Sequence, residues 1–149
     1  MKKLILTILF FSLSVSANAG DQQLEHYIAN FDYTARKDMK MDSMGLIKLL
    51  KQDKAQLIDI RFKEEYIAWK VGPSLNIPIN ELPDRLNELK LDKIIVTACP
   101  HKDRAIVAMA YLRSMGIKAK YLTDGLIGLA ENLRGDAAFD FVSRLKTVR

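Results

Sequence analysis

The residue best suited to covalent chemistry in this sequence is Cys99, the single cysteine among 149 residues. A thiolate is a strong nucleophile, and nearby cations lower the pKa of a thiol. Three basic side chains follow within five positions, namely His101, Lys102 and Arg104. Asp103 acts in the opposite direction unless its carboxylate points away. The segment therefore predicts a reactive cysteine with a lowered pKa, and the alternative is a buried cysteine that behaves as a small hydrophobe.

Cys99 lies between a strand pattern and a helix pattern. Residues 94–98 form a continuous apolar run, which is typical of a parallel strand covered on both faces. Residues 104–115 are rich in Ala, Met and Leu, and Gly116 follows in the position of a helix C-cap glycine. Ligands of parallel sheets bind at the carboxyl ends of strands, and the N-terminus of a helix favours an anion. This order predicts a thiolate stabilised by the loop backbone and by the helix after it.

Strand and helix patterns alternate along the chain. This alternation predicts an α/β fold with a central, mostly parallel sheet and helices on both faces. The other expected strands cover residues 39–41, 56–60, 75–77 and 117–122. The other expected helices cover residues 24–31, 42–52, 63–69, 81–89 and 139–146. Asp124 and Gly125 predict a turn after the last strand.

The first residues have the order of a secretory signal peptide. Lys2 and Lys3 precede an apolar run over residues 4–15, and Ala17 and Ala19 mark a cleavage site. The run is too short for a bilayer, which needs about 20 residues. We therefore predict a signal peptide at 1–19, a helical extension at 20–41, and one domain at 42–149 in the periplasm. The alternative is an uncleaved membrane anchor.

Composition narrows the choice of partners. The formal net charge of +5 falls to +3 without Lys2 and Lys3, and the sequence holds no basic stripe, so we expect no nucleic acid partner. No later run is apolar enough to span a membrane, so we expect no membrane partner after signal cleavage. One cysteine cannot form an internal disulfide, and an odd cysteine in an exported protein is a reactive thiol or an intermolecular partner. We expect no cofactor and no metal site.

The segment from Cys99 to Arg104 resembles the active-site loop of the rhodanese family, in which four residues separate a cysteine from an arginine. Ala105 matches the Ser or Ala that often follows. Three other segments are similar to motifs of that family. They are Leu-Ile-Asp-Ile-Arg at 57–61, the stretch from Glu-Glu-Tyr at 64–66 to Asn-Ile-Pro at 76–78, and Asp-Gly at 124–125. The four motifs, in this order over residues 42–130, resemble a single-domain, exported bacterial sulfurtransferase with a rhodanese-like fold.

The resemblance implies a two-step sulfur transfer with Cys99 and Arg104 as catalytic residues. Cys99 would attack a small anionic sulfur donor, such as thiosulfate or polysulfide, and hold the sulfur as a persulfide. A thiol, cyanide or a partner protein would then accept it. Arg104 would help to bind the donor. The other loop residues would line the donor site, namely Pro100, His101, Lys102 and Asp103. Two residues would brace the loop and the turn at 64–66, namely Asp59 and Arg61.

Two departures from the family pattern affect the substrate. Lys102 replaces a common glycine, which suggests a different loop geometry or donor preference. Trp69 and Lys70 replace Gly-His, and Trp69 either lines the pocket or caps the core. One alternative function is a cysteine-dependent phosphatase or arsenate reductase, but rhodanese-like phosphatases have five residues between cysteine and arginine. A loop of four suits one sulfur atom better than a tetrahedral oxyanion. The other alternative is a non-enzymatic periplasmic sulfur carrier or binding module.

Overall fold

The computed structural model of the chain describes residues 19–147. The predicted signal peptide lies outside the described residues, apart from Ala19 at its end. Within residues 19–147, no helix is both long enough and apolar enough to cross a membrane.

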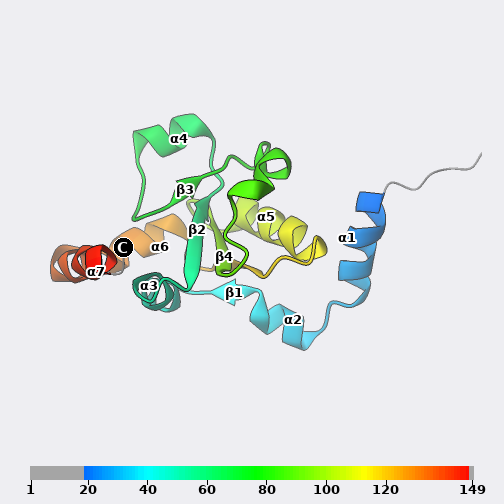
Figure 1. Cartoon of the computed structure of the whole chain (residues 1–149), viewed down its shortest axis with the longest axis horizontal. Helices are drawn as coiled ribbons and strands as arrows, with labels where there is room; N and C mark the ends of the chain where they lie inside the picture. Colours follow the sequence, from blue (N-terminus) through cyan, green and yellow to red (C-terminus); the bar gives the residue numbers. More distant parts are fainter. Residues whose placement is uncertain (1–18, 148–149) are drawn as a thin grey trace, which may run out of the picture.

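A five-stranded sheet forms the centre of the protein (Figure 1). Its strands are β1 (Lys40–Met41), β2 (Ala55–Asp59), β3 (Leu75–Asn76), β4 (Ile94–Ala98) and β5 (Ala119–Leu122). The strand order is β1-β5-β4-β2-β3, and every pairing is parallel. Ala55 pairs with Ile94 and Asp59 pairs with Ala98, so β2 and β4 are in register over their whole length. Their carboxyl ends therefore meet at one edge, which places residues 59–61 close to Cys99.

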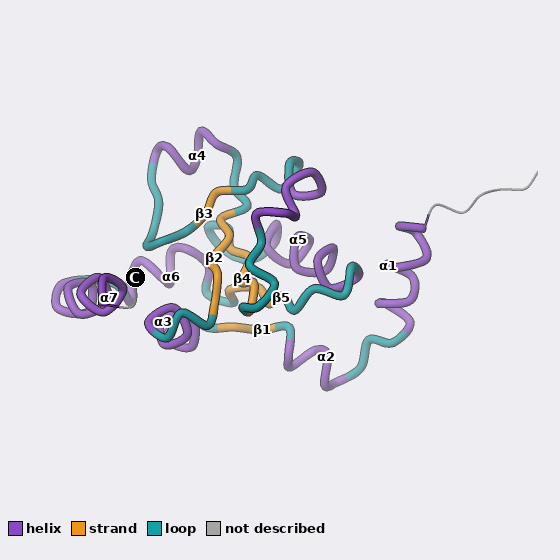
Figure 2. Tube along the Cα trace, viewed as in Figure 1, coloured by secondary structure: helices purple, strands orange, loops and turns teal. Residues whose placement is uncertain are grey.

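Helices cover both faces of the sheet, and the strands run between them (Figure 2). One face carries α3 (Ser43–Lys51), α6 (Gly125–Asn132) and α7 (Gly135–Thr147). The other carries α5 (Asp103–Ser114) and the short 3-10 helix η1 (Leu82–Glu88). Helix α4 (Lys63–Ala68) follows β2, while α1 (Ala19–Ala29) and α2 (Tyr33–Asp38) precede β1, and α1 packs on α5. The predicted α/β fold with a parallel sheet is confirmed.

Two hydrophobic cores form because successive side chains of a strand point to opposite faces. Along β4, Ile95 packs in the core beside α5, and Val96 packs in the core beside α3 and α6. Cys99 belongs to the α5 side. The buried hydroxyl of Thr97 donates to the Ala105 carbonyl over 2.8 Å, so this polar group inside the core has a partner. The register of β4 thus determines the face on which the thiol lies.

Several segments differ from the sequence-based expectation, among them α2, which has no expected counterpart, and α7, which begins at Gly135 rather than at residue 139. Residues 82–88 form a 3-10 helix that leaves helical angles at Arg85, rather than a regular amphipathic α-helix. Pro83, near its start, donates no backbone hydrogen bond. Asp124 and Gly125 do not form a simple turn. Gly125 begins α6, a helix that the sequence analysis missed, and it does so with a positive φ of 65°.

Helix α6 begins directly against the Cys99 loop. A Cβ atom on Gly125 would lie 2.2 Å from the carbonyl oxygen of His101 and 2.3 Å from that of Pro100. The next two backbone N–H groups bond to this loop, from Leu126 to the Cys99 carbonyl over 2.9 Å and from Ile127 to the Pro100 carbonyl over 3.3 Å. The absence of a side chain at position 125 is therefore a condition for the contact between helix and loop.

We expect Gly125→Ala to lower the free energy of unfolding by about 3 kcal/mol or more. Backbone atoms of the loop must move away from the new Cβ, and alanine is also strained at the positive φ of this position. Urea denaturation followed by circular dichroism measures this change.

Gly116→Ala is the matched control. Gly116 also has a positive φ, of 78°, but no atom lies within 4 Å of a Cβ built there. This variant should lose about 1 kcal/mol from backbone strain alone. Equal losses in the two variants would show that the close approach of α6 to the loop is not a constraint.

Candidate active site

Cys99 directly follows the last residue of β4, and none of its surface is exposed. The thiol donates a hydrogen bond to Asp103, with 3.4 Å between Sγ and Oδ1. The backbone N–H groups of Ala105 and His101 lie close enough to the sulfur to lower the pKa of the thiol. Asp103 is itself exposed, so its carboxylate stands between the buried sulfur and solvent on that side.

The electrostatics of the thiol differ from the expectation. Burial raises the pKa of Cys99, and the Asp103 carboxylate raises it further. The N–H groups of Ala105 and His101 lower this pKa but do not offset the burial. The predicted low pKa is therefore wrong. The sequence counted nearby cations without knowing that the sulfur would be desolvated or that Asp103 would point at it. At neutral pH the resting group is the thiol.

Arg104, at the first turn of α5, is held by a carboxylate from a distant segment. Its Nη1 lies 2.7 Å from Glu65 Oε2, and its Nη2 lies 2.9 Å from Glu65 Oε1. This two-point pairing raises the pKa of Arg104 and lowers the pKa of Glu65, so both groups stay charged. Both side chains are about one-third exposed, so the pair stands at the surface beside the loop.

A buried ion pair positions the helix that carries Glu65. Asp59 and Arg61 are both fully buried, and Arg61 Nη2 lies 2.6 Å from Asp59 Oδ2. The same guanidinium donates to the backbone carbonyl of Glu65 over 3.4 Å and to that of Trp69 over 2.7 Å. Arg61 therefore ties the end of β2 to both ends of the last turn of α4. The structure places Asp59 and Arg61 under the 64–66 turn and close to the loop.

The remaining predicted residues lie at the surface of the loop. Pro100 is half-buried, whereas His101 and Lys102 are exposed. Lys102 has φ −154°, so this position does not need the conformational freedom of glycine. Trp69 is 40% exposed, and its ring stacks on the Arg61 guanidinium, whose Cζ lies 4.0 Å from the ring centroid. Trp69 therefore covers the buried ion pair and is not part of the core.

Two functional contacts were missed by the sequence analysis. Glu65 is 39 residues from Arg104, and no local spacing reveals such a pair. In the sequence, Glu65 is only part of the Glu-Glu-Tyr segment at 64–66. Gly125 was noted only as a turn residue, although its Asp-Gly motif marked the place where α6 meets the loop.

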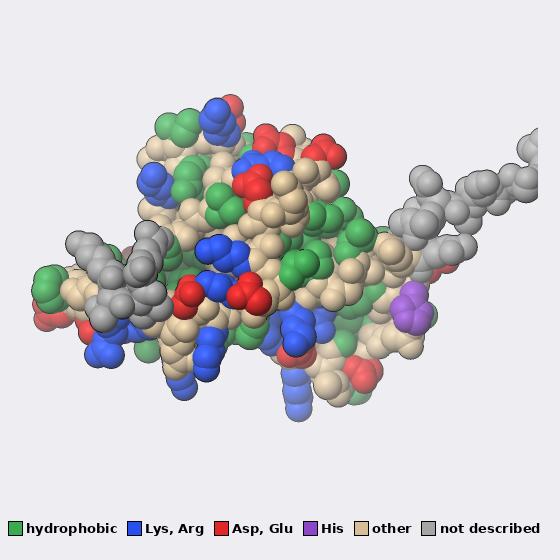
Figure 3. Space-filling model, in the orientation of Figure 1, with side chains coloured by type: hydrophobic (Ala, Val, Ile, Leu, Met, Phe, Trp, Pro, Cys, Tyr) green, Lys and Arg blue, Asp and Glu red, His purple; other side chains and the backbone are tan. Residues whose placement is uncertain are grey.

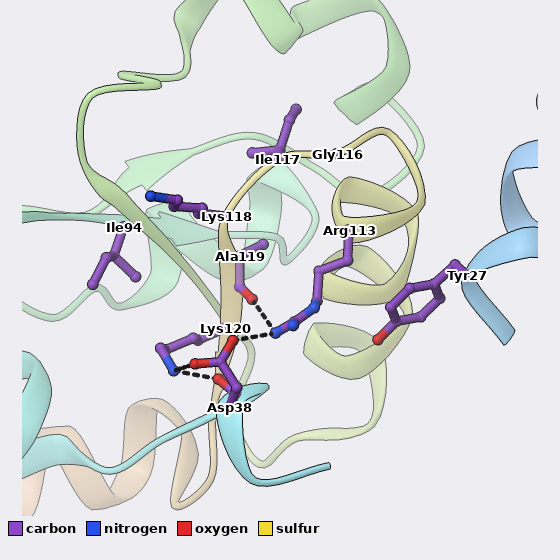
Figure 4. A pocket seen from close by; sticks show the side chains of 9 residues that line it. All are labelled: Tyr27, Asp38, Ile94, Arg113, Gly116, Ile117, Lys118, Ala119 and Lys120. Atoms are coloured by element: carbon purple, nitrogen blue, oxygen red, sulfur yellow. Dashed lines mark hydrogen bonds and ion pairs between the residues drawn. The ribbon is translucent and has the colours of Figure 1, made fainter. Parts of the chain in front are cut away.

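A cavity of about 500 Å³ lies at the opposite end of the sheet (Figure 4). It is lined by the starts of β4 and β5, at Ile94 and Ala119, together with Tyr27 from α1. Arg113 and Lys120 at this cavity both pair with Asp38. Because Cys99 follows the carboxyl end of β4, this cavity is separate from the site.

On the face in Figure 3, basic and acidic side chains lie next to one another. Among residues 19–147, no three His, Cys, Asp or Glu side chains group as metal ligands.

Comparison with known proteins gives one family. The family model described as "Rhodanese-like domain" matches residues 45–131. The thiosulfate sulfurtransferase GlpE of Pseudomonas syringae is 29% identical over 76 residues, which are 51% of this chain and 72% of that protein. The HTH-type transcriptional regulator Rv0324 of Mycobacterium tuberculosis is 37% identical over 91 residues, which are 58% of this chain and 40% of that protein.

Solved structures agree with the sequence comparison. The human single-domain sulfurtransferase TSTD1 superposes with a TM-score of 0.57 at 27% identity, covering 62% of this chain and 96% of that one. This chain spans two-fifths of the length of the mycobacterial regulator and most of GlpE and TSTD1. The family model matches more than half of the sequence. The parallel sheet, with the cysteine loop at its carboxyl edge, agrees with this match. The chain belongs to the rhodanese-like domain family.

Proposed function

We propose that this protein is a sulfurtransferase that carries sulfane sulfur on Cys99. The observation that carries the proposal is the setting of Cys99, which lies buried in the loop between β4 and α5, where the backbone N–H groups of Ala105 and His101 lower the pKa of its thiol. A persulfide places a second sulfur in the same surroundings, where N–H groups stabilise negative charge. The family match and the similarity to named sulfurtransferases support the same reaction class.

The transfer takes two displacements. In the first, the Cys99 thiolate attacks the outer sulfur of the donor, the donor's S–S bond breaks, and sulfite leaves thiosulfate or a thiol leaves a hydropersulfide. In the second, cyanide or an acceptor thiolate attacks the outer sulfur of the Cys99 persulfide, and Cys99 leaves as the thiolate. Sulfur changes partner without any external oxidant or reductant. Arg104 binds the anionic donor or leaving group with the guanidinium edge that Glu65 leaves free.

The charges around the thiol favour sulfur over phosphate chemistry. A phosphate or arsenate group bound at Cys99 carries up to two negative charges, and the Asp103 carboxylate contacts the same sulfur. Like charges this close in a partly desolvated site disfavour such a complex. We therefore propose sulfur transfer in place of the phosphatase alternative. We further propose that the protein acts in the periplasm after removal of residues 1–19, with a thiol, cyanide or a partner protein as acceptor.

Steady-state cyanolysis tests this function. With thiosulfate or a hydropersulfide as donor and cyanide as acceptor, the wild-type protein should release thiocyanate, measured by its coloured iron complex. Cys99→Ser should reduce release to the uncatalysed background, because the hydroxyl cannot form the persulfide. The protein should not hydrolyse p-nitrophenyl phosphate.

Ser nearly matches Cys in size, so thermal unfolding should show that the Cys99→Ser variant keeps its fold. Equal thiocyanate release by the variant and the wild type, or none by either with any sulfane donor, would favour the binding-module alternative and end the enzyme proposal.

The pH dependence of Cys99 alkylation tests the electrostatics. Because burial raises the pKa of this thiol, the iodoacetamide reaction should accelerate through and beyond the range of an ordinary thiol, about pH 8.5. Asp103→Asn should move the midpoint to lower pH, because the carboxylate that disfavours the thiolate is gone. Mass spectrometry of the quenched samples gives the rate.

The same protein unfolded in guanidinium provides the reference, since its thiol is solvated. A folded-state midpoint at or below that of the unfolded chain would contradict the raised pKa.

A further inference from the structure

The two charged side chains that contact Cys99 or Arg104 within residues 19–147 are both carboxylates. Asp103 Oδ1 accepts the Cys99 thiol hydrogen bond over 3.4 Å. Glu65 occupies two N–H groups of Arg104 over 2.7 and 2.9 Å. The arginine that would attract an anionic donor is therefore already paired, and the thiol has a negative charge beside it. His101 and Lys102 are exposed, so solvent screens the attraction that their side chains exert on an anion.

The path by which a donor reaches the sulfur adds to the repulsion of anionic donors. Cys99 has no exposed surface, whereas Asp103 is exposed and touches the sulfur. A donor that reaches Sγ from that side must pass the carboxylate or displace it. Interaction between like charges weakens slowly with distance in a site of low polarity, so a dianion meets a larger barrier than a donor with one charge or none.

From this arrangement we infer that Asp103, with Glu65 in support, makes the site select sulfane donors of low charge over the thiosulfate dianion. The inference rests on the proposed function and specifies its substrate class, a hydropersulfide of a small neutral thiol. In that reaction the thiol proton of Cys99 is released, its sulfur bonds to the outer sulfur of the donor, the donor's S–S bond breaks, and the leaving thiolate takes a proton. Atoms and charge balance without another reactant.

The effect of Asp103 on donor choice can be measured separately from its effect on the pKa of Cys99. Asp103→Asn lowers the pKa of Cys99, and the larger thiolate fraction accelerates the reaction with every donor by the same factor. The ratio of kcat/KM values for two donors cancels this factor. A purely structural or pKa role of Asp103 therefore leaves the ratio unchanged, whereas the charge selection changes it.

The experiment compares thiosulfate with 2-hydroxyethyl hydropersulfide in single-turnover loading of Cys99, quenched and read by mass spectrometry. Wild type should prefer the hydropersulfide. Asp103→Asn should shift the donor ratio toward thiosulfate by about tenfold or more, and Glu65→Gln should shift it in the same direction by a smaller factor. Added salt should accelerate thiosulfate loading of the wild type more than hydropersulfide loading, since it screens repulsion.

Glu64→Gln is the matched control. It removes the same charge from the neighbouring position of α4, but Glu64 is exposed and has no contact with Arg104 or Cys99 among the described contacts. Its donor ratio should equal that of wild type. An unchanged ratio in Asp103→Asn, or a wild-type preference for thiosulfate, would overturn the inference while leaving sulfur transfer intact. If neither donor loads Cys99, the proposed function itself fails.

Discussion

The buried ion pair between Asp59 and Arg61 is the interaction on which the site depends. It joins the carboxyl end of β2 to the carbonyls of Glu65 and Trp69, and so determines where α4 lies. Glu65 then holds Arg104 at the start of α5. A buried pair of this kind adds little net stability over an apolar replacement, but loss of one partner strands a charge and costs about 3–5 kcal/mol. The pair matters to this protein because it fixes α4, which carries Glu65, against the end of β2.

The second constraint is the burial of the thiol. Three elements enclose Cys99, since β4 delivers it, α5 follows it, and α6 binds the carbonyls of its loop. The resulting site differs from an open electropositive pocket. Its sulfur is protonated at rest, a carboxylate lies beside it, and its arginine is partnered. In such a site the backbone N–H groups of the loop contribute to stabilising a persulfide alongside the paired arginine. Under the proposed function, this arrangement favours sulfane donors of low charge.

The sequence predicted those features that depend on local pattern. The apolar run at 94–98 matched β4, and the helix expected over residues 42–52 is α3, Ser43–Lys51. The position of Cys99 between strand and helix followed from the same patterns. The features that the sequence did not predict correctly depend on tertiary contacts. The direction of the Asp103 side chain and the desolvation of the thiol reversed the predicted pKa. Gly125 begins a helix because its backbone meets the Cys99 loop, and the Glu65–Arg104 pair spans 39 residues. The signal peptide stays a prediction.

Mass spectrometry of the peptide that contains Cys99 shows whether this residue accepts a sulfur atom. The protein is incubated with a sulfane donor, freed of small molecules, and digested without reductant. We expect a gain of about 32 Da, one sulfur atom, on the Cys99 peptide, and the loss of this mass after treatment with cyanide. An unmodified Cys99 peptide after exposure to both thiosulfate and a hydropersulfide, in folded protein whose thiol still reacts with iodoacetamide, would contradict it.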